Sequence, residues 1–523
     1  MSDTLRPELA QLQARLANTE DDVRHEAAAK RHEKGYRTAR ENLHDLVDEG
    51  SFMEYGQLAV AAQRNRRDYQ DLQVNTAADG IITGIATINQ GMVAREAAQT
   101  AVMICDYSVL AGTQGYYHHH KLDRLCELAE DMKLPVVMYT EGGGGRPGDT
   151  DIATGVSGLN VESFLSWGRL SGKVPRIAVN NGYCFAGNAA LFGCADITIA
   201  TRTSWIGMAG PAMIEGGGLG KCAPTDIGPI DVQEKNGVVD IVAVDEAEAT
   251  AIAKKLLSYF QGPIQQWQAA DQAFLRNALP EDRRFGYNVR RIIECIADTD
   301  SFVELRRIYG RNIITGFIRI EGKPMGLLCS DCQQMGGAID SIASEKAARF
   351  LQLCDAFDLP VISLTDTPGY MVGMDSEKEG AVRKMSRLLV SGASITVPLV
   401  NIILRKAYGL GAIAMAGGSF VKPVYTASWP TGEFGAMGLE GSVKLGYRKE
   451  LDAVEDPAER EALFNQLVQR LYELGKATES AAALEIDAVI DPIDTRKVIL
   501  QALAAARNSY RSKPQRRNMI DTW

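Results

Sequence analysis

The feature that most constrains the fold of this chain is a long internal repeat. The stretch IITGIATI, residues 81–88, returns as IITGFIRI, residues 313–320. LPVVMYTEGGGG, which begins at Leu134, matches LPVISLTDTPGY, which begins at Leu359. The matches occur in the same order and at similar separations, which far exceed the periods of solenoid repeats. We therefore predict that a whole domain is duplicated.

Each copy reads as an alternation of strands and helices. VPRIAVNNGYCFAGNA, from Val174, matches VPLVNIILRKAYGLGA, from Val397. In both copies a strand pair leads to a helix with apolar residues at helical spacing, and then to an apolar strand, a loop, a second helix and a second apolar strand. Strands joined by crossover helices predict a layered α/β fold whose ligand site lies at the strand ends.

The length of the chain supports two large domains. Its 523 residues exceed the roughly 250 to 300 residues at which a single hydrophobic core stops growing. Proline and charged residues interrupt the apolar pattern in NALPEDRRFGYNVR, residues 277–290. We predict a charged helical arm over residues 1–50, a first domain over 51–285 and a second domain over 286–523.

Charge and cysteine content limit the classes of partner. The 66 acidic and 56 basic side chains give a net charge of −10, so we expect no general attraction to nucleic acid or to anionic membranes. No apolar run reaches the ~18 to 20 residues of a membrane span. The nine cysteines lie in apolar surroundings, which indicates reduced thiols, and the N-terminus has no apolar signal core. We expect a cytoplasmic protein without a nucleic-acid or membrane partner.

Both copies contain an apolar strand that breaks into a turn of small residues and then into a helix. The two stretches are GYCFAGNAALFG, residues 182–193, and KAYGLGAIAMAGG, residues 406–418. The first backbone N–H groups of a helix have no partner within the helix. Two such donors that converge can hold a developing oxyanion, and loss of one donor typically costs about 3 to 4 kcal/mol of transition-state stabilisation.

Superposition of the two copies yields the catalytic candidates. It places Gly187 and Asn188 over Leu410 and Gly411. Tight packing of a helix on a sheet is an alternative reason for small residues at such a turn. Because the turn is present in both copies, we favour two oxyanion sites and a reaction with two carbonyl centres.

A glycine loop supplies the candidates for substrate binding. TEGGGGRPGD, residues 140–149, is suited to cradle a phosphate or a pantetheine arm, but it lacks the Lys-Ser/Thr that completes a nucleotide P-loop. A purely structural role for this loop stays open. The candidate substrate-binding residues here are Gly143, Gly144, Gly145 and Arg146, together with Ala186 beside the first turn.

No pattern in the chain indicates a metal site or a histidine-based triad. In YYHHHK, residues 116–121, three adjacent histidines on a helix cannot all face one ion. All six histidines lie at or before His120, so the second half cannot build a triad from its own residues. We expect no metal and no covalent nucleophile.

Longer motifs cover essentially the whole chain: ARENLHDLVDEGSFMEYG, GYCFAGNAALFGCAD, KAARFLQLCDAFDLPVISLTDTPGYMVG, RKAYGLGAIAM and ASWPTGEFGAMGLEGSV. In these motifs the chain resembles the carboxyltransferase (β) subunit of biotin-dependent acyl-CoA carboxylases, the family of propionyl-, acetyl- and methylcrotonyl-CoA carboxylases. The resemblance implies an α/β fold with two tandem crotonase-like domains. It also implies that the first domain binds acyl-CoA and the second receives carboxybiotin.

The activity implied by the resemblance is transfer of CO₂ from carboxybiotin to the α-carbon of an acyl-CoA. Gly187 and Asn188 would hold the thioester enolate, and Leu410 and Gly411 the ureido oxygen of biotin. Ile413 would be a pocket residue. The implied partner is a biotin carboxylase and biotin carrier (α) subunit of the ligase complex, with biotin on that separate carrier. A homohexamer is implied, with each active site between two subunits.

The chain departs from this family at both turns. Relatives commonly show Gly-Gly where this chain has Gly187-Asn188, and a small residue where it has Leu410. Two alternatives therefore stay open. One is a stand-alone crotonase-type enoyl-CoA hydratase or isomerase, which would need a carboxylate beside the first turn. The other is a non-catalytic assembly subunit of a carboxylase complex.

Overall fold

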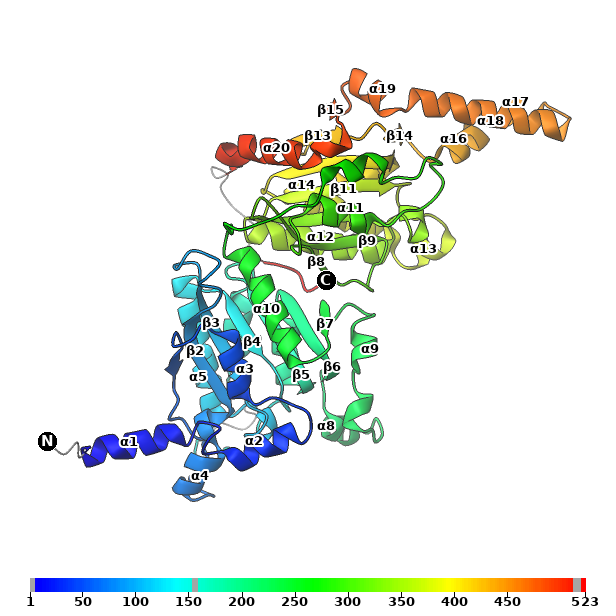
Figure 1. The fold of residues 1–523 in the computed structure, drawn as a ribbon. Coiled ribbons are helices and arrows are strands. Elements are labelled where there is room, and N and C mark those ends of the chain that lie inside the picture. Colours follow the sequence, from blue (N-terminus) through cyan, green and yellow to red (C-terminus); the bar gives the residue numbers. More distant parts are fainter. Residues whose placement is uncertain (1–4, 153–158, 511–518) are drawn as a thin grey trace. The chain divides into compact units, whose positions relative to one another are not determined.

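The computed structural model describes residues 5–152, 159–510 and 519–523. The chain forms two compact units, each with its own sheet and its own helices (Figure 1). The first unit ends at Gly262, and the second begins at Pro263. Each unit has a separate hydrophobic core, as expected for a chain of this length.

The division between the units differs from the predicted boundary at 285/286, which lies inside the second unit. Leu275 belongs to the core of that unit, although the sequence around it is rich in proline and charge. The Ile264 N–H also donates to the Gly322 carbonyl oxygen at 3.0 Å. The residues from 263 to 285 therefore pack with the second unit, through contacts that their local composition does not reveal.

The first unit contains a seven-stranded sheet whose strands lie side by side in chain order. The pairs β1–β2 and β2–β3 are antiparallel, and the later pairs are parallel. The strands are β1 (Met53–Tyr55), β2 (Ile81–Thr87), β3 (Gln99–Cys105), β4 (Val136–Tyr139), β5 (Arg176–Phe185), β6 (Ile197–Gly207) and β7 (Ile241–Ala243). The helices are α1 (Pro7–Ala17), α2 (His25–His32), α3 (Ala39–Leu46), α4 (Tyr69–Asn75), α5 (Tyr116–Met132), α6 (Ser163–Arg169), α7 (Gly187–Gly193), α8 (Pro211–Gly216), α9 (Ile230–Gln233) and α10 (Glu246–Phe260).

The second unit contains an eight-stranded sheet in the order β15-β13-β12-β11-β10-β9-β8, with β14 paired to β12. The strands are β8 (Val303–Leu305), β9 (Ile313–Ile320), β10 (Lys323–Ser330), β11 (Val361–Thr367), β12 (Leu399–Tyr408), β13 (Tyr425–Ser428), β14 (Glu433–Gly435) and β15 (Ala488–Val489). The helices are α11 (Val289–Ile296), α12 (Ser341–Ala356), α13 (Met374–Lys378), α14 (Ala381–Ser394), α15 (Gly409–Met415), α16 (Leu439–Gly446), α17 (Arg448–Asp452), α18 (Pro457–Leu474), α19 (Ala477–Ala482) and α20 (Thr495–Tyr510).

The two sheets share topology and register, which confirms the predicted duplication. The first two strand pairs of each sheet are antiparallel, and the central strands are parallel. Glu54 of β1 lies opposite Gly84 of β2, and Glu304 of β8 lies opposite Gly316 of β9. Both glycines belong to the IITG motif that recurs in the sequence. The repeated letters therefore mark the same place in two copies of one fold.

A buried lysine in each unit repeats the same contact. Lys121 of α5 donates from Nζ to the carbonyl of Ile81, the first residue of β2. Lys346 of α12 donates from Nζ to the carbonyl of Ile313, the first residue of β9, at 2.7 Å. Both ammonium groups lie in the interior, where carbonyl oxygens replace water as acceptors. Each lysine thus fixes the main helix of its unit to the start of the repeated strand.

The predicted helical arm over residues 1–50 divides into two parts. Helices α1 and α2 have no matching helix among the described residues of the second unit, whereas α3 matches α11. In α3, Arg40 pairs with Glu54 at 2.7 Å, and in α11, Arg290 pairs with Glu304 at 2.6 Å. Helix α3 therefore belongs to the repeated fold, and only the segment before it is additional to that fold.

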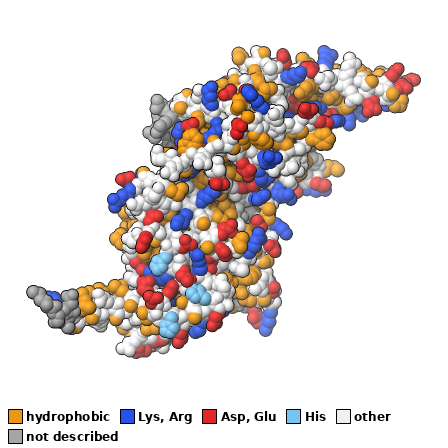
Figure 2. Space-filling model, in the orientation of Figure 1, with side chains coloured by type: hydrophobic (Ala, Val, Ile, Leu, Met, Phe, Trp, Pro, Cys, Tyr) orange, Lys and Arg blue, Asp and Glu red, His pale blue; other side chains and the backbone are white. Residues whose placement is uncertain are grey.

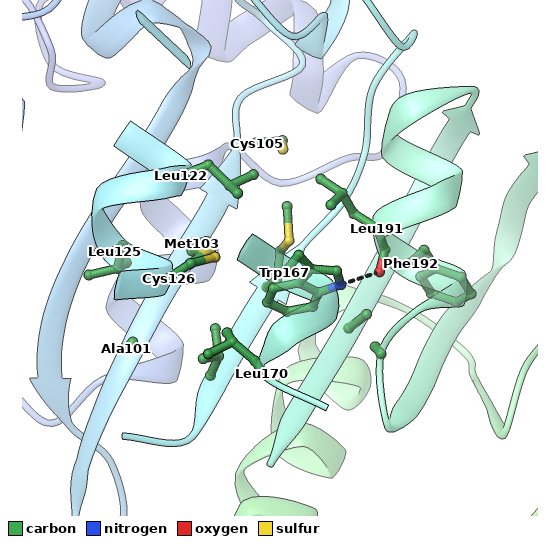
Figure 3. Packing of buried hydrophobic residues seen from close by; sticks show 14 of the residues in the cluster. Ala101, Met103, Cys105, Leu122, Leu125, Cys126, Trp167, Leu170, Leu191 and Phe192 are labelled. Atoms are coloured by element: carbon green, nitrogen blue, oxygen red, sulfur yellow. Dashed lines mark hydrogen bonds between the residues drawn. The ribbon is translucent and has the colours of Figure 1, made fainter. Parts of the chain in front are cut away.

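The core of the first unit lies between its sheet and helices α5 and α6 (Figure 3). Trp167 of α6 is fully buried, and its indole N–H donates to the Leu191 carbonyl oxygen at 2.9 Å. Leu122 and Cys126 of α5 and Phe192 of α7 belong to the same cluster. This core therefore supports α7, the helix that follows the first small-residue turn.

The surface carries charges of both signs. On the face shown in Figure 2, basic and acidic side chains are interspersed across both units. Within the part of the chain that the structure describes, no helix has the length and apolar character needed to cross a membrane.

Candidate active site

The first turn, residues 186–188, joins β5 to α7. Ala186 precedes the helix with φ 50° and ψ −119°, which is an unusual conformation for a residue with a side chain. Its N–H donates to the Gly207 carbonyl of the adjacent strand at 3.0 Å, so this donor is engaged. The N–H groups of Gly187 and Asn188 belong to the first helical turn, where no carbonyl four residues earlier lies within the helix. They are therefore the donors that this turn can offer to a ligand.

The glycine loop that follows β4 lies directly against the first turn. The Gly142 N–H donates to the Tyr183 carbonyl at 2.8 Å, and the Phe185 N–H donates to the Gly142 carbonyl at 2.9 Å. A side chain at Gly144, which has φ +89°, would bring its Cβ to 2.7 Å from the Ala186 Cβ. The structure thus places Gly144 of the predicted binding loop beside the predicted catalytic turn.

Asn188 joins the loop to the turn through its side chain. This residue is fully buried, and its Oδ1 accepts a hydrogen bond from the Gly144 N–H at 3.0 Å. Its Nδ2 donates to the Gly112 carbonyl at 3.4 Å. The Asn188 side chain therefore extends into the interior of the unit, where it fixes the loop to the turn.

The other predicted binding residues lie in different environments. The guanidinium of Arg146 is buried, pairs with Asp79 and donates to the Thr113 carbonyl at 2.8 Å. It holds the base of the loop and does not extend into solvent. Gly143 lies near Thr113, and a Cβ placed at Gly145 would meet only open space. Of the predicted loop residues, Gly143 and Gly145 are therefore the exposed ones.

Two residues beside the first turn were not found from the sequence. A Cβ at Gly187 would overlap the side-chain amide oxygen of Gln114 and approach the Phe164 ring to 3.3 Å. The Gln114 Nε2 is buried and has no hydrogen-bond acceptor among the described residues. Neither residue belongs to a recognisable motif. They reach the turn only because α6 and the loop before α5 fold against it.

The second turn, residues 409–411, joins β12 to α15 in the same manner. Gly409 has φ +56°, and α15 begins there. Leu410 is 61% exposed, whereas Gly411 is buried against the loop that follows β11. A Cβ at Gly411 would lie 2.7 Å from the Cα of Gly369. The loop at Gly369 therefore covers the second turn, as the glycine loop covers the first.

The remaining predicted site residues, Leu410 and Ile413, lie on the short helix that follows the second turn. The Leu410 side chain points outward, so it does not fill the space between the turn and the loop at Gly369. Ile413 lies one turn further along α15 and is partly exposed. The structure thus brings Leu410, Gly411 and Ile413 together on one short helix.

A buried carboxylate precedes the covering loop in each unit. In the first unit Glu141 binds the Arg31 guanidinium through both oxygens, at 2.9 and 2.7 Å. Burial raises the pKa of Glu141 to about 7, although the neighbouring Arg31 favours the ionised form. In the second unit Asp366 pairs with Arg405 at 3.0 Å. Both acids are engaged inside the protein and do not act as free bases.

The histidine cluster does not form a metal site. His118 is fully buried, and both of its ring nitrogens lack partners among the described residues. His119 instead contacts the Ser163 hydroxyl through Nδ1 at 2.8 Å. Across residues 5–152, 159–510 and 519–523, no group of three or more histidine, cysteine or acidic side chains is arranged to hold a metal ion.

Comparison with curated proteins shows similarity along nearly the whole chain. The chain is 31% identical over 506 residues to the methylmalonyl-CoA carboxyltransferase 12S subunit of Propionibacterium freudenreichii, which covers 94% of this chain and 92% of that protein. It is 32% identical over 516 residues to a propionyl-CoA carboxylase beta chain of Saccharopolyspora erythraea, with 94% and 91% covered.

Solved structures show the same relationship. A single-chain, multi-domain long-chain acyl-CoA carboxylase matches with a TM-score of 0.91 and 53% identity over 95% of this chain. The present chain spans only 49% of the length of that protein. A transcarboxylase 12S structure, described as a hexamer, matches with a TM-score of 0.84 and 29% identity over 99% of this chain and 98% of the other.

These neighbours have the crotonase-like fold, which confirms the fold predicted for both units. The sequence model of the carboxyl transferase domain family matches residues 30–520, a range that includes both turns and both covering loops. The chain therefore belongs to the carboxyl transferase domain family, as its sequence motifs predicted.

Proposed function

We propose that this chain is the carboxyltransferase component of a biotin-dependent acyl-CoA carboxylase. It would move CO₂ from carboxybiotin to the α-carbon of an acyl-CoA. One observation carries the proposal: each unit sets a short helix against a glycine-containing loop, at Gly144 in the first unit and at Gly369 in the second. Two turns of the same construction suit a reaction in which two carbonyl groups develop negative charge.

The first turn would act on the CoA thioester. As the α-proton leaves, negative charge grows on the thioester oxygen, and the N–H groups of Gly187 and Asn188 would stabilise it. The buried Asn188 side chain keeps the loop and the turn at a fixed separation through the Gly144 N–H. These donors are oriented before substrate binds, so little reorganisation is needed during the reaction.

The second turn would hold the biotin group. Carboxybiotin supplies the CO₂, and its ureido oxygen is an acceptor that suits two backbone donors. The N–H groups of Leu410 and Gly411 would provide those donors. The exposed Leu410 side chain would contact an apolar part of the ring system, and Ile413 would line the neighbouring pocket. Charge is thus handled by backbone dipoles, without a reactive side chain.

We further propose the assembly in which this activity operates. The first unit would bind acyl-CoA and the second would receive carboxybiotin from a separate biotin carboxylase and carrier (α) subunit. A homohexamer, with each active site between two subunits, is supported by the similarity to the transcarboxylase 12S subunit, whose structure is described as a hexamer. The reaction would take place in the cytoplasm.

The test is decarboxylation of malonyl-CoA or methylmalonyl-CoA in the presence of free biotin. Gly187→Pro deletes one N–H of the first turn, and Leu410→Pro deletes one of the second; proline is tolerated in the first turn of a helix. Each should lower kcat by about 10²- to 10³-fold. Leu410→Ala keeps its N–H group and is the matched control for Leu410→Pro. Gly187→Ala also keeps the N–H group and controls for the overlap of an added Cβ with the Gln114 side chain.

Proline variants as active as the wild type would exclude the two turns as oxyanion sites. A hydratase assay on an enoyl-CoA separates the crotonase-type alternative. That activity requires a carboxylate free to act near the first turn, whereas Glu141 is held by Arg31. Binding of acyl-CoA without any turnover would instead favour the assembly subunit.

A further inference from the structure

The two units neutralise equivalent buried carboxylates with arginines from different parts of the fold. Glu141 and Asp366 occupy the same position in the matching motifs that begin at Leu134 and Leu359. Both side chains are buried. Each immediately precedes the loop that covers a candidate oxyanion turn. A buried carboxylate needs a partner, so each unit must provide a cation at this point.

In the second unit the cation comes from the adjacent strand. Arg405 of β12 donates from Nη2 to Asp366 Oδ2 at 3.0 Å. The Tyr287 hydroxyl donates to the same oxygen at 2.8 Å, and the Lys406 N–H donates to Oδ1 at 3.1 Å. The acid, the arginine and the second turn are therefore all parts of the repeated fold.

In the first unit the adjacent strand cannot supply a cation. The position that matches Arg405 is Gly182, which has φ +79°. A Cβ at Gly182 would overlap the Glu141 carboxylate, so the space of a side chain is already taken by this acid. The cation is instead Arg31 of α2, which binds both carboxylate oxygens. Arg31 belongs to the segment before α3 and thus lies outside the repeated fold.

The position of the Glu141 carboxylate bears directly on the first turn. Glu141 is followed by Gly142, which forms backbone hydrogen bonds with Tyr183 and Phe185 at the end of β5. Two residues later the Gly144 N–H binds Asn188. A shift of Glu141 therefore moves the covering loop against the turn.

The ion pair also borders space into which Glu141 could move. A polar cavity of about 20 Å³ is lined by Arg31, Glu141, Asn42 and Asn181, among others. Asn181 is one of the residues that line this cavity, and its Nδ2 is buried without a hydrogen-bond partner among the described residues. The Glu141 carboxylate therefore borders a small cavity in addition to the Arg31 guanidinium. Arg31, which binds both carboxylate oxygens, fixes its position.

We propose that Arg31 is a positioning residue of the carboxyltransferase site: by binding both oxygens of Glu141 it holds the glycine loop against the first turn, so the geometry of this turn depends on the Arg31–Glu141 contact. The role of Arg31 in catalysis rests on the proposed function. Its role in holding the glycine loop rests on the structure alone.

The test compares three variants of the full chain. Arg31→Gln removes the cation, and Arg31→Lys restores the charge without the two-pronged contact. Arg24→Gln is the matched control, because Arg24 also joins the N-terminal segment to the first unit, through Asp106 at 2.8 Å, with side chains only 8% and 12% exposed. If Arg31→Gln does not fold, the double variant Arg31→Gln/Glu141→Gln removes the unpaired buried charge and takes its place.

The first measurement is hydrogen–deuterium exchange, which needs no activity. We expect the hydrogen-bonded amides of Gly142, Gly143 and Gly144 to exchange about tenfold faster in Arg31→Gln than in the wild type, with an intermediate rate in Arg31→Lys. Arg24→Gln should leave these amides unchanged. Exchange of these amides in Arg31→Gln at the wild-type rate would overturn the proposal.

The second measurement is the split between kcat and KM in the decarboxylation assay. Arg31→Gln should lower kcat by about tenfold or more with a much smaller change in KM for the CoA thioester, because aligned donors act mainly in the transition state. Arg31→Lys should recover part of kcat. Faster exchange with an unchanged kcat would overturn the positioning role. If the wild type shows no decarboxylation, the proposed function fails, and the exchange data still decide whether Arg31 holds the loop.

Discussion

The two turns share a backbone plan but place their large side chains in opposite ways. In the first turn Asn188 is fully buried and accepts a hydrogen bond from the Gly144 N–H. In the second turn Leu410 is 61% exposed, and Gly411 packs against the backbone of Gly369. The groups that the two turns have in common are main-chain N–H groups. The two copies therefore share the backbone geometry of the turn, whereas the side chains at the turn have different structural roles in each copy.

The comparison between the two buried acids predicts the largest effect. Asp366 accepts hydrogen bonds from Arg405, Tyr287 and the Lys406 N–H, so Asp366→Asn would leave a buried guanidinium unpaired and turn an amide NH₂ towards donors. We expect a loss of about 3 to 5 kcal/mol in the free energy of unfolding, measured by denaturant titration.

Glu141→Gln should cost less, about 1 to 3 kcal/mol at pH 7, although it too leaves a buried arginine, Arg31, without its carboxylate. Burial raises the pKa of Glu141 to about 7, so part of the folded population already carries a neutral side chain at that pH. Equal losses in the two variants would show that the source of the arginine makes no difference to stability.

The pH dependence of stability sharpens the same comparison. The Glu141 carboxyl ionises near pH 4.5 in the unfolded chain and near pH 7 in the folded one, so between these values the folded state holds more protons. Stability should therefore fall as pH rises through this window, by about 1.4 kcal/mol per pH unit relative to Glu141→Gln.

Asp106→Asn is the control for this dependence. Burial opposes ionisation of Asp106, but Arg24 and Ser108 outweigh it and hold the Asp106 pKa below its usual value. The wild type should therefore show no fall in stability between pH 4.5 and 7 relative to Asp106→Asn. If the stability of the wild type fell by the same amount relative to Glu141→Gln and relative to Asp106→Asn, the pH dependence would not be specific to Glu141.

Removal of the Asn188 side chain tests the first turn. Asn188→Ala would leave the buried Gly144 N–H without its acceptor and should destabilise the chain by about 2 kcal/mol. Decarboxylation should fall as well, because the loop would no longer be fixed to the turn. A variant with unchanged stability would mean that Gly144 finds another acceptor.

Removal of the Leu410 side chain tests the second turn and should have the smallest effect on stability. Because this side chain is mostly exposed, Leu410→Ala should change the free energy of unfolding by less than about 0.5 kcal/mol. A raised KM for free biotin would then report a contact with the ring. A loss of stability as large as that of Asn188→Ala would contradict the outward placement of Leu410.

Much of the fold was predictable because the motifs of the first copy recur in the same order in the second, and because the apolar residues within each motif have helix or strand spacing. The IITG strands, the two apolar Val-Pro strands and both small-residue turns appear where the aligned motifs place them. The boundary at 285/286 was misplaced, because Leu275 packs into the second core despite its polar sequence neighbours. The match between α3 and α11 was also missed, since their residues differ and only the Arg40–Glu54 and Arg290–Glu304 pairs reveal it.

The side-chain environment of the candidate site was less predictable. Arg146 lies in the glycine loop, but Asp79 draws its guanidinium inward. Gln114, Phe164 and Arg31 reach the first turn or its loop from distant segments and belong to no recognisable motif. Contacts across such separations depend on how helices dock on the sheet, which no local pattern encodes.

By itself the sequence determined that a domain is duplicated, that each copy alternates strands and helices, and that two turns of small residues occupy equivalent places. These features follow from residue spacing and the order of motifs, which can be read directly from the sequence. Only the tertiary structure decided which side chains surround the turns, which arginine neutralises each buried acid and where Asn188 and Leu410 point. The reason is physical: a buried charge must find a partner in space, and that partner can come from any segment that packing brings near.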